Sequence, residues 1–280
     1  MINVRMTALS TLSSLLLWLA TPGLAGEWQL VWSDEFDKPG LPDPAKWDYE
    51  TGFIRNNEAQ YYTRARPENA RVENGMLVIE ARKEVFKNPD FDPGAGSWRR
   101  SREAAQYTSA SLTTRGKANW TYGRIEVRAK LPSGRGTWPA IWTLGTNRQA
   151  GWPGCGEIDI MEFVGYDPGV VHANIHTGKY NHIKKNGKGS QLTVPDASSA
   201  FHVYALEWDT NHLDFFVDDK KYFTYANEGT GADAWPYDRA QYLILNLAIG
   251  GAWGGQQGID DAIFPQRYYI DYVRVYQKKG

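Results

Sequence analysis

The sequence predicts an all-β protein, an antiparallel β-sandwich in which two sheets enclose one core. From Trp28 onward, short segments with apolar residues at alternate positions are separated by Gly, Pro and Asn. Only residues 196–200 suit a turn of helix. Many short strands without helical crossovers are typical of antiparallel sandwiches and barrels. The chain has 280 residues and a hydrophobic content of 42%, enough for one sizeable core.

The individual strands follow from this alternation. Residues 72–79 form a hairpin around Asn74-Gly75, the strongest short-range turn signal. Residues 83–105 contain Pro, Gly and three Arg, and we expect a loop there rather than a domain linker. The other predicted strands are 28–32, 123–131, 202–208, 213–217, 222–225, 242–249 and 268–277.

Composition narrows the function classes. A formal net charge of −1 argues against a nucleic-acid-binding surface. Aromatic residues make up 14% of the chain, with 12 Trp, which favours a sugar-binding cleft in addition to the core. The single cysteine, Cys155, excludes an intrachain disulfide. No Cys/His motif accompanies it, so we expect a small buried thiol and not a nucleophile.

Residues 1–25 are predicted to be a signal peptide. Arg5 is their only charge, residues 8–20 are apolar, and Gly23-Leu24-Ala25 offers small residues for cleavage. The apolar run is too short for a membrane span. We therefore expect one domain over residues 26–280, exported to the periplasm or secreted, with no membrane attachment after cleavage.

Residues 156–165 hold three carboxylates within six positions. On a strand, Glu157 and Asp159 share one face, and Ile158 and Ile160 share the other. Glu162 is out of phase, and a β-bulge near 160–161 would bring it onto the face of the other two acids. A helix would spread the acids over about 200° and leave no compact apolar stripe.

Such a row of acids suits glycoside hydrolysis. One carboxylic acid protonates the leaving oxygen, and one carboxylate attacks the anomeric carbon or activates water. Crowded like charges raise at least one pKa, which supplies the acid. Acids on an arbitrary strand more often face solvent, but the surrounding aromatic residues and the apolar opposite face argue against that here.

The segment 157–162 resembles the bulged signature of glycoside hydrolase family 16, in the form seen in laminarinase-like β-1,3-glucanases; mixed-linkage lichenases usually lack the extra residue. The resemblance extends over nearly the whole chain and implies a jelly roll (concanavalin A-like) with a substrate cleft on the concave sheet. Its further blocks are residues 32–36, 56–62, 122–130, 136–142, 152–153, 250–255 and 271–276.

The resemblance also implies roles for the acids. Glu157 matches the nucleophile and Glu162 the general acid/base of a retaining mechanism with a covalent glycosyl-enzyme. Asp159 lies between them and is expected to hydrogen-bond the nucleophile, lowering its pKa or steadying the intermediate. The implied activity is endo-hydrolysis of β-1,3-glucan without a catalytic cofactor, by a protein expected to be monomeric.

Aromatic and polar residues elsewhere are expected to bind the sugar. For Trp142 core packing is a strong alternative, and for Asn57 a turn role is nearly as favourable. His176 resembles the family histidine near the acid/base; spacing alone would also allow metal binding by His172 and His176, a weak signal. The expected substrate-binding residues are Trp138, Trp142, Trp152, Trp253, His176, Asn57 and Glu58.

Family members often bind one structural Ca²⁺. The matching residues here are Glu35, Gly75 and Asp271, whose hard oxygen ligands suit that ion. Nothing in their spacing alone suggests a site, and the ion would take no part in catalysis.

Two rival functions stay open at this point. A β-glucan-binding protein of the same fold would lack one or both glutamates, and this chain has both Glu157 and Glu162. A relative acting on mixed-linkage glucan or on a galactan would keep them. A sulfated galactan would require a basic cleft, and the cluster at Arg99, Arg100 and Arg102 more simply forms a solvated loop.

Overall fold

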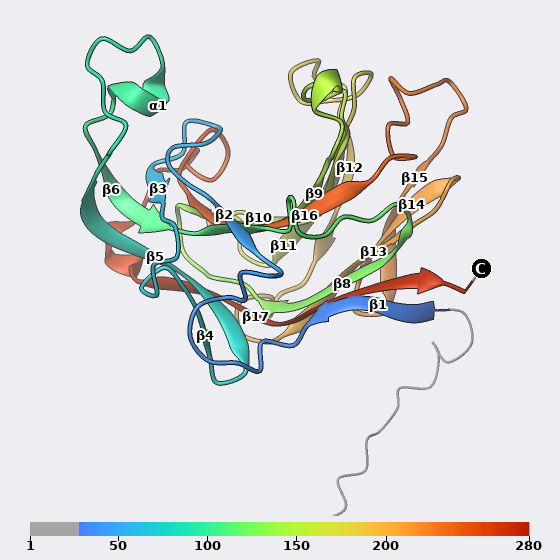
Figure 1. Cartoon of the computed structure of the whole chain (residues 1–280), viewed down its shortest axis with the longest axis horizontal. Helices are drawn as coiled ribbons and strands as arrows, with labels where there is room; N and C mark the ends of the chain where they lie inside the picture. Colours follow the sequence, from blue (N-terminus) through green and yellow to red (C-terminus); the bar gives the residue numbers. More distant parts are fainter. Residues whose placement is uncertain (1–27, 280) are drawn as a thin grey trace, which may run out of the picture.

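The computed structural model describes residues 28–279, so the predicted signal peptide at 1–25 lies outside the described residues. Two β-sheets pack face to face, and they confirm the predicted all-β sandwich (Figure 1). No helix in the described part of the chain is long and apolar enough to cross a membrane.

The larger sheet contains ten strands in the order β15-β14-β13-β8-β17-β5-β6-β3, with β1 beside β17 and β4 beside β5. All pairs are antiparallel except β3 with β6. The strands are β1 (Trp28–Asp34), β3 (Gln60–Tyr62), β4 (Ala70–Glu73), β5 (Met76–Lys87), β6 (Ala104–Ser109), β8 (Gly123–Lys130), β13 (His202–Trp208), β14 (His212–Val217), β15 (Lys220–Ala226) and β17 (Gln266–Lys278).

The smaller sheet contains seven strands in the order β12-β11-β10-β9-β16-β7-β2. Its strands are β2 (Asp48–Glu50), β7 (Ser111–Thr113), β9 (Thr137–Gly145), β10 (Glu157–Phe163), β11 (Val170–His176), β12 (Lys188–Thr193) and β16 (Gln241–Ile249). The helical elements among residues 28–279 are one turn of α-helix, α1 (Trp98–Ser101), and two 3₁₀ turns, Arg148–Ala150 and Asp261–Ile263.

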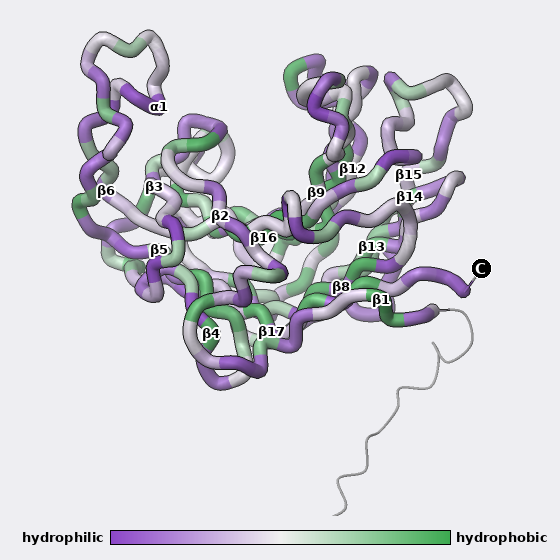
Figure 2. Tube along the Cα trace, viewed as in Figure 1, coloured by the Kyte–Doolittle hydropathy of each residue, from purple (hydrophilic) through white to green (hydrophobic). Residues whose placement is uncertain are grey.

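The main core lies between the two sheets. It contains the fully buried residues of one face of each sheet, among them Leu77, Val127, Ile158 and Leu245. Figure 2 shows the hydrophobic segments following the strands, whereas the projecting part that carries α1 is largely hydrophilic or neutral. With roughly 25 cal/mol per Å² of apolar surface removed from water, this core supplies the main stabilisation of a chain without disulfides.

The predicted hairpin is confirmed at β4 and β5. Asn74 and Gly75 both adopt positive φ, 54° and 72°. Two successive left-handed residues make the tight turn that matches the twist of antiparallel strands, and Asn-Gly adopts it at low cost. The turn predicted at residues 196–200 is also present, because the Ala200 amide donates to the Asp196 carbonyl at 2.8 Å.

The prediction for residues 83–105 is wrong in part. Strand β5 continues to Lys87 and β6 starts at Ala104, so both ends of this segment are paired strand. The remaining residues, 88–103, form a projection that includes α1, and we call this projection together with the ends of β5 and β6 the arm. In Figure 1 the arm rises from one end of the sandwich. The Pro, Gly and Arg residues in the middle of this segment indicate a loop more strongly than the short ends indicate strands.

Candidate active site

Strand β10 carries all three acids on one face because it is bulged as predicted. Its pairing with β11 shifts register between Asp159 and Glu162, and its pairing with β9 shifts between Asp159 and Met161. The extra residue lets Ile158, Ile160 and Met161 all enter the core. We call the face of the seven-stranded sheet that carries the acids the site face.

The register of the sheet determines which residues surround the acids. One row of directly paired residues crosses the site face through Glu162. A second row passes through Asp159. The first row is His172, Glu162, Ala140, Asn246, Ser111 and Glu50, and the second is Asn174, Asp159, Trp142, Ile244, Thr113 and Asp48.

Glu157 is held from two sides. The Trp152 indole N–H donates to its Oε2 at 2.9 Å, and His176 Nε2 lies 3.6 Å from its Oε1. Burial raises the pKa of the Glu157 carboxyl to about 8, and a negative charge on Asp159 adds to the rise. His176 and the Trp152 N–H act in the opposite direction and favour the ionised form.

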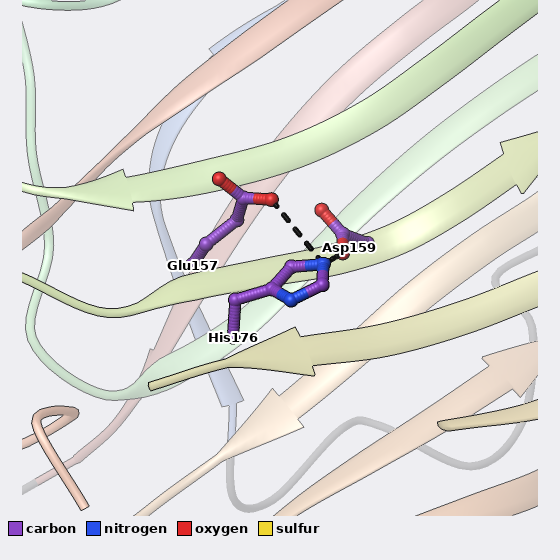
Figure 3. Close-up of side chains that lie close together, drawn as sticks. All are labelled: Glu157, Asp159 and His176. Atoms are coloured by element: carbon purple, nitrogen blue, oxygen red, sulfur yellow. Dashed lines mark ion pairs between the residues drawn. The ribbon is translucent and has the colours of Figure 1, made fainter. Parts of the chain in front are cut away.

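Asp159 is the most buried of the three acids, with 3% of its surface exposed. Burial raises its pKa well above the ordinary value, and the charge of Glu162 adds to this. His176 Nε2 lies 3.4 Å from its Oδ2, so the imidazole faces Asp159 and Glu157 together (Figure 3). Asp159 and Glu157 are close enough for a hydrogen bond between the two carboxyl groups when one of them holds a proton.

The predicted role of Asp159 depends on its protonation state. A charged Asp159 raises the pKa of Glu157, whereas a protonated Asp159 that donates a hydrogen bond to Glu157 would lower it, as predicted. Like charges at short range disfavour ionisation. Asp159 assists the nucleophile only in its protonated form, as a hydrogen-bond donor.

Glu162 accepts one hydrogen bond on each carboxylate oxygen. Trp138 Nε1 donates to Oε1 at 3.1 Å, and Asn174 Nδ2 donates to Oε2 at 3.0 Å. Burial raises the pKa of Glu162, and these two donors partly oppose the rise. A raised pKa favours the protonated form of the carboxyl, which is the form that a general acid needs.

Asn174 lies on β11 between His172 and His176 and was not among the predicted site residues. Its position is constrained by β12, where a side chain at Gly189 would place Cβ 2.1 Å from Asn174 Oδ1. Gly189 therefore leaves the space that the amide occupies beside Glu162. Sequence alone gave no sign of this, because Asn174 and Gly189 meet only through the pairing of β11 with β12.

The predicted tryptophans occupy different positions around the acids. Trp138 and Trp253 pack edge to face with ring centroids 5.6 Å apart, beside Glu162. Trp152 is 40% exposed and lies near His176 and His182, with centroids 5.9 and 5.3 Å away. Its ring is therefore available to a ligand while its N–H orients Glu157.

Trp142 lies on the site face but is covered. Only 7% of it is exposed, its N–H donates to Asn246 Oδ1 at 2.7 Å, and the Arg55 guanidinium lies 4.8 Å from the ring centroid. The Asn246 amide in turn donates to the Tyr62 hydroxyl at 3.0 Å. Trp142 thus belongs to a packed polar layer, and Arg55 and Asn246 are residues that the sequence pattern did not reveal.

Asn57 and Glu58 lie in a turn that Arg102 fixes. Arg102 donates to the Asn57 Oδ1 and, at 2.7 Å, to the Glu58 carbonyl. Asn57 is exposed and has a φ of 55°, as suits its turn. Glu58 is 2% exposed and accepts from Gln60 at 2.8 Å, so its carboxylate is engaged inside the protein and is not available to a sugar hydroxyl.

Potential metal ligands gather at one place among residues 28–279, where Glu157, Asp159 and His176 offer atoms within 4.8 Å of one another. His172 instead packs against Trp253, 5.0 Å between centroids, and does not join His176. Cys155 is 6% exposed, which confirms the expectation of a buried thiol, and burial raises its pKa.

The carboxylates predicted to bind calcium are engaged by arginines. Glu35 accepts two hydrogen bonds from Arg274, at 3.0 and 2.8 Å. Asp271 accepts one from Arg128. Gly75 lies in the β4–β5 turn. The oxygen chemistry suits Ca²⁺, but each carboxylate would have to exchange its arginine for the ion.

The site face therefore presents Glu157 and Glu162, each with its own hydrogen-bond donors, the buried Asp159 between them, and indole rings around them. This is the equipment of a glycoside hydrolase that works with paired carboxylates. The chain belongs to glycosyl hydrolases family 16, whose model matches residues 57–274. Hydrolases of this family need no catalytic cofactor.

Three known proteins illustrate the similarity. The chain is 53% identical over 263 residues to a beta-glucanase of Rhodothermus marinus, covering 90% of this chain and 86% of the relative. The structure of the laminarinase from Rhodothermus marinus matches with a TM-score of 0.82 at 52% identity, over 90% of this chain and 98% of that one. A keratan-sulfate endo-1,4-beta-galactosidase of Sphingobacterium multivorum is 35% identical, over 92% of this chain and 57% of its own length.

Removal of the indole N–H of Trp152 or of Trp138 should change the width of the pH optimum in opposite directions. Loss of an N–H donor raises the pKa of the carboxyl it served. Trp152→Phe should therefore move the acidic limb of the kcat/KM profile, which needs ionised Glu157, to higher pH and narrow the optimum. Trp138→Phe should move the alkaline limb, which needs protonated Glu162, to higher pH and broaden it. Each variant is the control for the other, and equal profiles would refute the separate assignments.

Proposed function

We propose that the protein is a secreted, endo-acting β-1,3-glucanase of the laminarin-degrading type that retains anomeric configuration. The observation that carries this proposal is the bulged β10, which places Glu157 and Glu162 on one face with one indole donor each. The similarity to a laminarinase over nearly the whole domain supports the substrate class.

In the first step, a carboxylate oxygen of Glu157 attacks the anomeric carbon. Glu162 gives its proton to the leaving glycosidic oxygen, and the aglycone departs. In the second step, Glu162 takes a proton from water, whose oxygen attacks the anomeric carbon and releases Glu157. Protonated Asp159 steadies the Glu157 carboxylate by a hydrogen bond both before attack and after release.

A side-by-side assay of reducing-end release tests the substrate. We expect laminarin to be cleaved fastest, ahead of barley mixed-linkage glucan, agarose, κ-carrageenan and keratan sulfate. Glu157→Ala provides the blank. Faster release from a galactan would overturn the specificity, and release from none would favour a glucan-binding protein.

The alternative of a sulfated galactan receives little support from the charges. Arg102 is committed to the Asn57–Glu58 turn, and Arg100 pairs with Asp92 at 3.0 Å. The sequence predicted that all three arginines lie in a solvated loop, but Arg102 instead holds this turn. With Arg100 paired as well, the cluster offers little free positive charge to a sulfated substrate.

Export and a monomeric state are parts of the same proposal. The apolar stretch at 8–20 and the small residues at 23–25 support cleavage after residue 25. Mass spectrometry of protein from the periplasm and medium should find a mature chain that starts at Gly26. Light scattering should give the mass of one chain. A retained leader would contradict the proposed export, and a dimer mass would contradict the monomeric state.

We further propose a structural role for Ca²⁺ at Glu35, Gly75 and Asp271. Replacement of the arginine partners by an ion of higher charge would tie the first strand to the last. At saturating calcium the thermal midpoint should rise by roughly 5 °C over that in EDTA. The initial rate on laminarin should not change. Equal thermal midpoints in calcium and in EDTA would contradict the calcium site and leave Glu35 and Asp271 paired with their arginines.

A further inference from the structure

Three side-chain atoms of different chemistry converge at one end of the row of acids. His176 Nε2 lies 3.6 Å from Glu157 Oε1 and 3.4 Å from Asp159 Oδ2 (Figure 3). One donor atom from each residue lies within 4.8 Å of the other two. No step of the reaction proposed above passes through His176, so this group of three atoms has a capacity that hydrolysis does not use.

The spacing of these atoms is that of ligands around one small metal ion. A tetrahedral Zn²⁺ ion lies about 2.1 Å from each nitrogen or oxygen ligand. Two ligands of such an ion are therefore about 3.4 Å apart, because the edge of a tetrahedron is about 1.6 times the distance from its centre to a corner. Both distances from His176 Nε2 are close to this value. Only small movements of the side chains are needed to hold an ion.

The Asp159 carboxyl directs an unpaired oxygen into this group. Asp159 is 3% exposed, and its Oδ2 is buried without a hydrogen-bond partner among the described residues. The neighbouring imidazole nitrogen lies at 3.4 Å. Buried polar atoms in folded proteins normally have a partner, and a bound ion is one explanation for an atom that lacks one. A divalent cation would satisfy this oxygen and would also offset the repulsion between the carboxylates of Glu157 and Asp159.

The protein holds the three side chains from behind. Glu157 and His176 lie directly opposite each other in the pairing of β10 with β11. The buried Tyr237 hydroxyl lies 2.9 Å from the Glu157 carbonyl and 3.3 Å from the His176 carbonyl, so it links the two strands at this point. The Trp152 N–H holds Glu157 Oε2 and leaves Oε1 to face the imidazole. Outer partners that orient ligands in this way strengthen metal binding.

The donor set selects among metals. One imidazole nitrogen and two carboxylate oxygens suit Zn²⁺ and Cu²⁺. Ca²⁺ takes about six to eight oxygen ligands, and Mg²⁺ keeps several water molecules in an octahedral shell, so neither suits this group. The side chains of Glu157 and His176 are 16% and 13% exposed, so solvent reaches the group from the substrate side. An ion that enters from there keeps a water molecule as its fourth ligand.

We propose that Glu157, Asp159 and His176 form a reversible inhibitory site for Zn²⁺ or a similar divalent transition metal. The ion takes the carboxylate that attacks the anomeric carbon, so the occupied enzyme does not form the glycosyl-enzyme. The inhibitory effect rests on the proposed function, whereas binding of the ion does not. Free Zn²⁺ in the surroundings thereby sets the fraction of the enzyme that is active.

Calorimetric titration with ZnCl₂ tests the site without reference to activity. The parent protein should bind about one equivalent of Zn²⁺. Asp159→Asn and His176→Gln should each weaken binding by at least about 100-fold, because loss of an outer partner alone costs about 10- to 100-fold. His182→Gln is the matched control and should bind like the parent. His182 is exposed, and its ring centroid lies 5.2 Å from that of His176, but it is not one of the three clustered residues.

Inhibition of laminarin hydrolysis tests whether the ion occupies the nucleophile. At substrate concentrations well below KM, Zn²⁺ should halve the initial rates of the parent and of His182→Gln at a concentration near its calorimetric Kd. EDTA should restore the rate, and Ca²⁺ or Mg²⁺ should not lower it.

Several results would overturn the metal site alone. These are an active parent that binds no Zn²⁺, binding without inhibition, and affinities of Asp159→Asn and His176→Gln equal to that of the parent. Loss of affinity in His182→Gln would place the ion between the two histidines and would also overturn the site. A parent that is inactive on laminarin in EDTA would overturn the proposed function, and the calorimetric result would still stand.

Discussion

Glu157→Ala is expected to reduce hydrolysis of laminarin by at least about 10⁴-fold, since it removes the atom that bonds to the anomeric carbon. The space left beside Trp152 and His176 admits a small anion. Azide or formate should therefore restore turnover of an activated aryl glycoside, and azide should yield a glycosyl azide of inverted configuration. Initial rates and product analysis provide the measurement.

The folded state should survive this change. Glu157 is a buried carboxyl whose pKa is raised to about 8 by burial and by Asp159, so its removal relieves an unfavourable environment. The thermal midpoint of Glu157→Ala should be equal to or above that of the parent. Activity within ten-fold of the parent, or no effect of azide, would remove the nucleophile assignment.

Local sequence information was sufficient for the parts of the molecule that repeat a pattern. The three acids lie in one segment, and the phase error between Asp159 and Glu162 was enough to predict the bulge. The Asn74-Gly75 turn carries its own conformational signal. The long strands β8 and β16 were predicted because apolar residues recur along residues 123–131 and 242–249.

The rest depends on long-range pairing. β2, β3 and β7 have three residues each, too few to show a period. β12 is mostly exposed and reads as polar loop. The partners of the acids and of Trp142 come from other strands or loops. The register of the sheet brings Asn174 and Asn246 into place, and the packing of the loop after β2 brings Arg55 there.

The burial of Trp142 and Glu58 also depends on packing between segments that lie far apart in the sequence. Both residues lie in blocks that resemble the family, and their residue types suit sugar contacts. Residues 51–62 fold against the site face, where Arg55 covers the Trp142 ring and Gln60 engages Glu58. Whether solvent reaches Trp142 or Glu58 depends on how residues 51–62 pack, and the residues next to them in the sequence do not show it.

Glu162→Gln should separate the two halves of the catalytic cycle. On laminarin, whose leaving group needs a proton, kcat/KM should fall by roughly 10²–10⁴-fold. On a dinitrophenyl β-glucoside or laminaribioside, whose leaving group departs as a stable anion, kcat/KM should fall less than about ten-fold, because this constant reports the first step. The turnover number should still fall, because Glu162 also activates water in the second step.

The hydrogen-bond partners of Glu162 make Glu162→Gln a strict test of its role as the general acid. Trp138 and Asn174 both donate to the carboxylate, and a glutamine offers only one acceptor oxygen. Rotation of the Asn174 amide would turn its oxygen toward the new NH₂ group and restore the second hydrogen bond, so the site should keep its shape. Azide should then accept the glycosyl group from Glu157 without base assistance and raise turnover of the aryl glycoside. Equal losses of kcat/KM on laminarin and on the aryl glycoside would show that Glu162 positions the substrate and does not transfer a proton.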